Sequence, residues 1–102
     1  MRLSKYVAFG KITSHPGQRD ALAQILLEAA DLMKAYEGCE LYIVGTVDDD
    51  PDSVWVTEIF KDAEAHKASL ALESVQEIIQ RGRPLIVGGE QIKLNPLGGK
   101  GL

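Results

Sequence analysis

The spacing of hydrophobic residues changes abruptly within the stretch VWVTEIFKDAEAHKASLA, residues 54–71. Its first seven residues are mostly β-branched or aromatic and alternate with period 2, which is typical of a strand. After Lys61-Asp62 an alanine-rich run begins, and its pattern has the period of a helix. The sequence therefore predicts a strand that ends at Phe60 and a short helix for which Asp62 is the N-cap.

The same two periods alternate along the rest of the chain. They predict a strand over 5–13, a helix over 22–36, a hairpin of strands over 39–47 and 53–60, the short helix after Asp62, a further helical segment opened by Ser74 and Glu77 as a capping box, and a strand over 85–94. This βαββαβ order is that of the ferredoxin-like α+β fold, in which helices cover one face of a four-stranded antiparallel sheet. A chain of 102 residues supports one domain, which we place at residues 1–95, with residues 96–102 as a flexible C-terminal tail.

The predicted strands are apolar on both faces. In the first strand Val7 and Phe9 lie opposite Ala8 and Ile12, so neither face has the polar character of a solvated surface. Helices can cover only one of these faces. We therefore expect the open face to pack against the same face of a second copy, in a homodimer that buries about 2,000 Å² or more.

Composition narrows the class of partner and the compartment. A net charge of −4 argues against nucleic acid and anionic membranes as partners, because both bind basic surfaces. Cys39 is the single cysteine, so no internal disulfide can form, and no apolar run has the length of a signal peptide or a membrane span. We expect a cytoplasmic protein whose partners are small molecules.

Three short motifs point to a known family. They are Pro16-Gly17 before the first helix, Glu37-Gly38-Cys39 before the second strand, and Glu58-Ile59-Phe60 followed by a helix that carries His66. In their order and spacing these motifs resemble the antibiotic biosynthesis monooxygenase family and its quinol monooxygenase-like members, small proteins of the dimeric α+β barrel superfamily. The resemblance runs from about Tyr6 to about Gly89.

The resemblance implies a cofactor-independent monooxygenase that oxidises a quinol or a related polyphenolic aromatic with O2, using neither a metal nor a flavin. An electron-rich aromatic, once deprotonated, can itself reduce oxygen, so the protein need only hold it in a dry pocket, remove a proton and stabilise the anion. Many relatives have Trp where this chain has Phe60. The haem-degrading relatives use an asparagine in the first strand, whereas the one asparagine here is Asn95, which argues against haem degradation.

Two alternatives remain open, because a fold does not fix a function. One is a non-catalytic member of the same fold that binds a small molecule or is associated with stress. The other is a small isomerase on the same barrel.

Two polar residues near the strand-to-helix transition are the candidates for proton transfer. His66 is the candidate base, because a neutral imidazole accepts a proton near physiological pH; the alternative is a half-exposed helix histidine that only bonds a neighbour. Glu58 shares a strand face with Val56 and Phe60. A carboxylate on such a face is either paired, with Arg81 or Arg83, or has a raised pKa.

Aromatic residues are the other substrate-binding candidates. Tyr42 either donates a hydrogen bond to a quinol oxygen or packs in an interface, and Phe60 is predicted to line the pocket. Trp55 has the opposite parity to Phe60 on the same strand, so we assign it to the core or to an interface. No metal site is predicted, since the aspartate-rich turn from Asp48 to Asp52 lacks the glycine and glutamate of a calcium loop.

Overall fold

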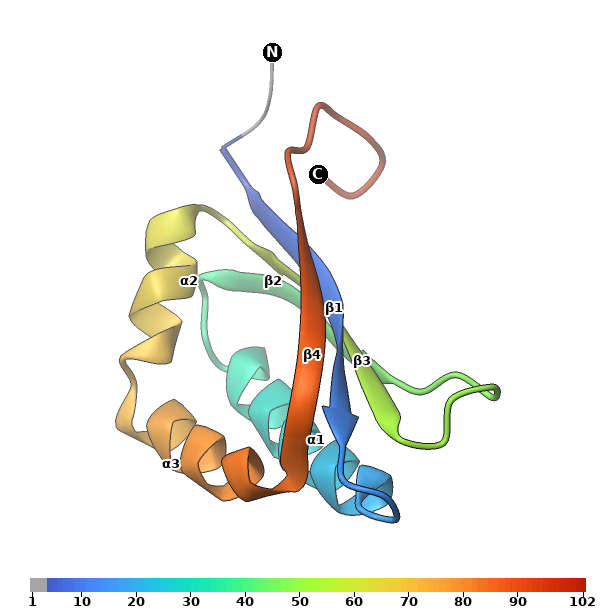
Figure 1. The fold of residues 1–102 in the computed structure, drawn as a ribbon. Coiled ribbons are helices and arrows are strands. Elements are labelled where there is room, and N and C mark those ends of the chain that lie inside the picture. Colours follow the sequence, from blue (N-terminus) through green and yellow to red (C-terminus); the bar gives the residue numbers. More distant parts are fainter. Residues whose placement is uncertain (1–3) are drawn as a thin grey trace.

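Four strands form one antiparallel sheet, in the order β2-β3-β1-β4, in the computed structural model, which describes residues 4–102 (Figure 1). The elements in chain order are β1 (Tyr6–Ser14), α1 (Arg19–Lys34), β2 (Cys39–Gly45), β3 (Ser53–Phe60), α2 (Ala63–Leu70), α3 (Glu73–Gly82), the 3₁₀ turn η1 (Arg83–Leu85) and β4 (Ile86–Leu94). The α-helices lie on one side of the sheet (Figure 1). The predicted ferredoxin-like α+β fold is therefore confirmed.

The transition between β3 and α2 lies where the sequence places it. Phe60 is the last residue of β3, and the Asp62 side chain accepts a hydrogen bond of 2.7 Å from the backbone N–H of Ala65. This bond satisfies one of the free N–H groups at the start of α2. Because the cap fixes where α2 begins, it also fixes which helix residues face the sheet.

The predicted capping box at the start of α3 is wrong. The helix begins at Glu73, so Ser74 already lies inside its first turn, and no side chain caps the helix at Leu72. The carbonyl of Leu72 accepts a 2.9 Å hydrogen bond from the N–H of Gln76, which starts the helical pattern before Ser74 can serve as a cap. The spacing of Ser74 and Glu77 fits the motif, but the short connection from α2 sets an earlier start.

The register of the strands aligns residues of β1, β2 and β3 side by side. Tyr6 of β1 pairs with Phe60 of β3, and Glu58 of β3 lies between Ala8 of β1 and Tyr42 of β2. Residues directly opposite in antiparallel strands project to the same face, which here is the helix side. The core on that side contains Tyr6, Ala8, Met33, Phe60, Ala65 and Val75.

Glycine in β1 allows β4 to come close on this face. A Cβ atom on Gly10 would collide with the carbonyl oxygen of Glu90 and would lie 2.9 Å from the Cα of Gln91. Any larger residue would push β4 away from β1. β4 ends at Leu94, so the predicted domain boundary follows the last strand, while the flexibility of residues 96–102 stays a prediction.

The sheet face opposite the helices carries large apolar side chains. Ile43 and Ile92, on the two edge strands, are each 55% exposed. Trp55 projects to this face as well, and its indole Nε1 is buried without a hydrogen-bond partner among residues 4–102. Apolar side chains thus occupy both faces of the sheet, as the sequence predicts.

No helix within the described part of the chain is long and apolar enough to span a bilayer. The cytoplasmic location stays a prediction.

The homodimer also stays a prediction, and the open face defines how to test it. We expect sedimentation velocity to give a dimer at micromolar concentration and Ile92→Lys to give a monomer, because a charge on the joined faces would be buried without a partner. Leu27→Lys, which replaces an exposed apolar residue of α1 instead, should leave the dimer intact. A monomeric wild-type protein would contradict the prediction.

Candidate functional site

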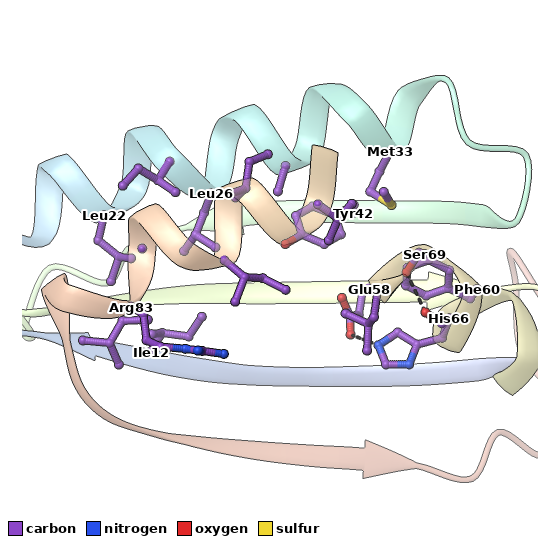
Figure 2. Close-up of a pocket in the computed structure, with 18 residues that line it drawn as sticks. Ile12, Leu22, Leu26, Met33, Tyr42, Glu58, Phe60, His66, Ser69 and Arg83 are labelled. Carbon is purple, nitrogen blue, oxygen red and sulfur yellow. Dashed lines mark hydrogen bonds and ion pairs between the residues drawn. The ribbon is translucent and has the colours of Figure 1, made fainter. Parts of the chain in front are cut away.

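A pocket of about 220 Å³ lies between the helices and the inner face of the sheet (Figure 2). Its walls are mostly aliphatic, and it is lined by Ile12, Leu22, Ile25, Leu26, Ala29, Met33, Tyr42, Glu58, Phe60, His66, Ser69, Leu70, Val75, Ile78, Ile79, Gly82, Arg83 and Ile86. An apolar cavity of about 150 Å³ is enough to admit benzene, so this one has room for a substituted ring or a pair of fused rings. Polar groups are few, and they therefore decide what can bind.

Glu58 and His66 face each other in this pocket. The distance from Glu58 Oε1 to His66 Nε2 is 3.5 Å, and the two side chains are 12% and 19% exposed (Figure 2). The glutamate comes from the sheet and the histidine from α2, so the β3–α2 transition brings the two together. The four site candidates predicted from the sequence all line this same pocket. They are His66, Glu58, Tyr42 and Phe60.

The predicted pairing of Glu58 with an arginine is wrong. Arg81 instead donates to both carboxylate oxygens of Glu28 on α1, at 3.0 and 2.8 Å. Arg83 lines the pocket but makes no ion pair with Glu58. The helix that carries Arg81 packs against α1 and leaves His66 as the partner within reach of Glu58.

The sequence also allows a raised pKa for Glu58, and the environment of its carboxyl group produces one. Burial raises the pKa of Glu58 from 4.5 to about 7. The physical cause is the loss of hydration for the charged form on an apolar face. Glu58 is thus able to exchange a proton near neutral pH, which an exposed glutamate cannot do.

The imidazole of His66 is held between aromatic rings. Tyr6 stacks on it with ring centroids 4.0 Å apart and planes 10° apart, and Phe60 meets it edge-on at 5.0 Å. Burial, followed by the positive charge of Lys93, lowers the pKa of His66 below 6.5. The histidine is therefore neutral at pH 7 and able to accept a proton.

Tyr42 lies beside Glu58 on the neighbouring strand and points into the pocket (Figure 2). Burial, with a further contribution from Glu58, raises the pKa of its hydroxyl well above 10. The hydroxyl makes no hydrogen bond within residues 4–102. Tyr42 is thus a protonated donor that is free to bond a ligand oxygen.

The prediction that Trp55 lies apart from Phe60 is confirmed. Trp55 does not line the pocket, because its parity places it on the opposite face. Across the described residues, no group of three or more His, Cys, Asp or Glu side chains could hold a metal ion.

Sequence reasoning did not identify Tyr6 as part of the site. Its parity with Ala8 and Ile12 placed it on the correct face, but its contact with His66 depends on the pairing of Tyr6 with Phe60. That register is not readable from one strand alone. The sequence predicts Arg83 only as a partner for Glu58, and its position at the pocket wall follows from the 3₁₀ turn after α3.

The sequence profile of the antibiotic biosynthesis monooxygenase family matches residues 5–81, which is more than half of the chain. The chain belongs to this family. No curated protein matches the sequence.

Solved structures agree with the assignment. One solved structure is that of a protein of Chloroflexus aurantiacus J-10-fl, provisionally named an antibiotic biosynthesis monooxygenase, which is 46% identical to this chain. The TM-score is 0.86, and the match covers 96% of this chain and 98% of the other. A Deinococcus radiodurans protein with the same provisional name is 20% identical, with a TM-score of 0.81 over 95% and 97% of the two chains. SnoaB of Streptomyces nogalater, a cofactor-independent oxygenase solved in a mutant form, is 14% identical, with a TM-score of 0.81 over 97% and 99%. The last two similarities support the fold alone.

The raised pKa of Glu58 makes the stability of this family member depend on pH. The folded chain keeps the Glu58 proton up to about pH 7, whereas the unfolded chain releases it near 4.5. Between these values the folded state binds more protons, so the free energy of unfolding falls as pH rises, by on the order of 3 kcal/mol. The lowered pKa of His66 acts in the other direction, because the unfolded state binds the extra proton below 6.5.

We expect Glu58→Gln to raise the free energy of unfolding by about 1–3 kcal/mol at pH 8 and by much less at pH 5, because an amide carries no charge to bury. Urea unfolding of both proteins at the two pH values measures the difference. Glu37→Gln, at an exposed position, is the matched control and should change stability by less than about 0.5 kcal/mol. A Glu58→Gln protein that is less stable than wild type at pH 8 would contradict the account.

Proposed function

We propose that the protein is a cofactor-independent monooxygenase that oxidises a quinol or a related polyphenolic aromatic with O2. The observation that carries the proposal is the contact of 3.5 Å between Glu58 and His66 inside an otherwise apolar pocket. Family membership supports it, as does the similarity in fold to SnoaB, a cofactor-independent oxygenase.

The reaction balances with the quinol as the only reductant. Loss of a hydroxyl proton gives an electron-rich anion, and a ring carbon then transfers electrons to O2 and forms a carbon–oxygen bond. The resulting peroxide anion takes up a proton to give a hydroperoxide. The O–O bond then breaks as the same ring carbon loses its hydrogen as a proton, so water leaves and a carbonyl group remains. The sum is quinol plus O2 giving a hydroxylated quinone plus water, with one oxygen atom in each product.

His66 is the proposed base in this sequence. Its imidazole is neutral at pH 7 because burial lowers its pKa, so it can accept the hydroxyl proton. The imidazolium formed would face the Glu58 carboxylate at 3.5 Å and be stabilised by it. One proton is then shared by the pair, and the two groups titrate together.

The other polar and aromatic groups orient the substrate. The free hydroxyl of Tyr42 can donate to the oxygen on which negative charge develops, which is the role of an oxyanion donor. Phe60 is 2% exposed and provides a flat apolar wall beside His66. A bound aromatic ring would displace water from the aliphatic lining, so the charges would act on the anion with less screening.

We expect His66→Ala to lower quinol-dependent oxygen uptake by roughly 10²–10⁴-fold, the usual contribution of a positioned base. The measurement is oxygen consumption with a panel of reduced naphthoquinols, corrected for autoxidation. His15→Ala removes an exposed histidine outside the pocket and should leave the rate unchanged. Because His66 stacks on Tyr6, its replacement also costs on the order of 1 kcal/mol of stability, so thermal unfolding accompanies the assay.

The same assay separates the alternatives. With ¹⁸O2, a monooxygenase places one labelled atom in the quinone, whereas formation of H2O2 without labelled product indicates an oxidase. Equal corrected rates for wild type and His66→Ala would remove His66 from the mechanism. A wild-type rate that does not exceed autoxidation for any quinol would favour a non-catalytic binding protein.

A further inference from the structure

Arg83 is the one side chain of fixed positive charge among the described residues that line the pocket. It follows α3 directly and opens the turn η1. Its guanidinium makes no hydrogen bond or ion pair with any residue from 4 to 102. Arg81, two residues earlier, is in contrast held by both oxygens of Glu28 and does not line the pocket.

The arginine and the proton-transfer pair lie toward opposite ends of the pocket. Figure 2 shows Arg83 beside Ile12 at one end, with its guanidinium pointing along the pocket toward the end where Glu58 and His66 lie. Ile12 is four residues along β1 from Ala8, the residue that pairs with Glu58. At a rise of about 3.3 Å per residue, this separation along β1 is about 13 Å. The gap between the Arg83 guanidinium and Glu58 is smaller, because the arginine side chain points toward Glu58 (Figure 2).

The space between the two ends suits a flat apolar body with a polar group at each end. The walls between them are aliphatic, including Leu22, Leu26 and Ile78. A guanidinium group binds a carboxylate with two parallel hydrogen bonds, a geometry that a neutral group cannot match. Arg83 is exposed, so its guanidinium stands where the pocket meets solvent and can pair with a ligand that carries a negative charge at that end.

We propose that the substrate is a one- or two-ring aromatic that carries a carboxylate remote from the hydroxyl group that loses its proton, and that Arg83 binds this carboxylate. The assignment of the hydroxyl end rests on the function proposed above. The carboxylate contact needs no turnover and is tested by binding alone.

The probes are 6-hydroxy-2-naphthoic acid and its neutral amide, which have the same rings and hydroxyl group. Calorimetric titration at pH 8 should show that the wild-type protein binds the acid about tenfold or more tightly than the amide. Arg83→Gln should weaken binding of the acid by about 10–100-fold and leave the amide unchanged, because a charged hydrogen-bond pair is lost. Arg81→Gln is the matched control, since it removes an arginine outside the pocket, and should bind both probes as the wild type does.

Equal affinities of the wild type for acid and amide would overturn the inference, as would an Arg83→Gln protein that binds the acid as tightly as wild type. Failure to bind either probe would overturn it too. Oxygen uptake is a separate result. Oxidation of neutral quinols without any preference for the acid would leave the monooxygenase proposal intact and refute the role of Arg83. Binding of the acid through Arg83 without oxidation of any quinol would do the reverse.

Discussion

The burial of one carboxyl group, that of Glu58, is the constraint on which the rest of the site depends. A charged carboxylate on the apolar face of a sheet is costly unless it is paired or protonated. Here the pKa is raised to about 7, and the nearest titratable partner is a histidine, itself neutral because of burial. Above neutral pH the buried charge of Glu58 lowers the free energy of unfolding. Such a cost is typical of a functional site rather than of a packing solution.

The transition from β3 to α2 places the other groups of the site around Glu58. Phe60 ends β3, and Asp62 fixes the first turn of α2, so His66 follows one turn later above the same face as Glu58. Tyr6 of β1, which pairs with Phe60 of β3, stacks on the imidazole. The histidine is held by aromatic rings on two elements and its ring has little freedom to turn, which is the kind of preorganisation that a proton transfer requires.

Much of this arrangement is readable from the sequence. Strand periodicity predicts that Glu58 and Phe60 share a face and that Trp55 does not, and the cap at Asp62 predicts where the helix begins. Periodicity within one segment, however, carries no information about register between segments. The stack of Tyr6 on His66 and the approach of Tyr42 to Glu58 arise from register, so they could not be predicted. For the same reason the predicted pairing of Glu58 with Arg81 or Arg83 is wrong, because the partner of Arg81 depends on how α3 packs on α1.

The most direct test of the central claim is the titration of Glu58 itself. Carbon-13 NMR of protein labelled at glutamate side-chain carboxyls follows each group through pH, and Glu58→Gln identifies the resonance by its disappearance. The account predicts a midpoint near pH 7 for Glu58, well above the ordinary value of 4.5. A midpoint near 4.5 would mean that the carboxylate is hydrated or fully paired in the folded protein, and the proposed proton-transfer site would then have no physical basis.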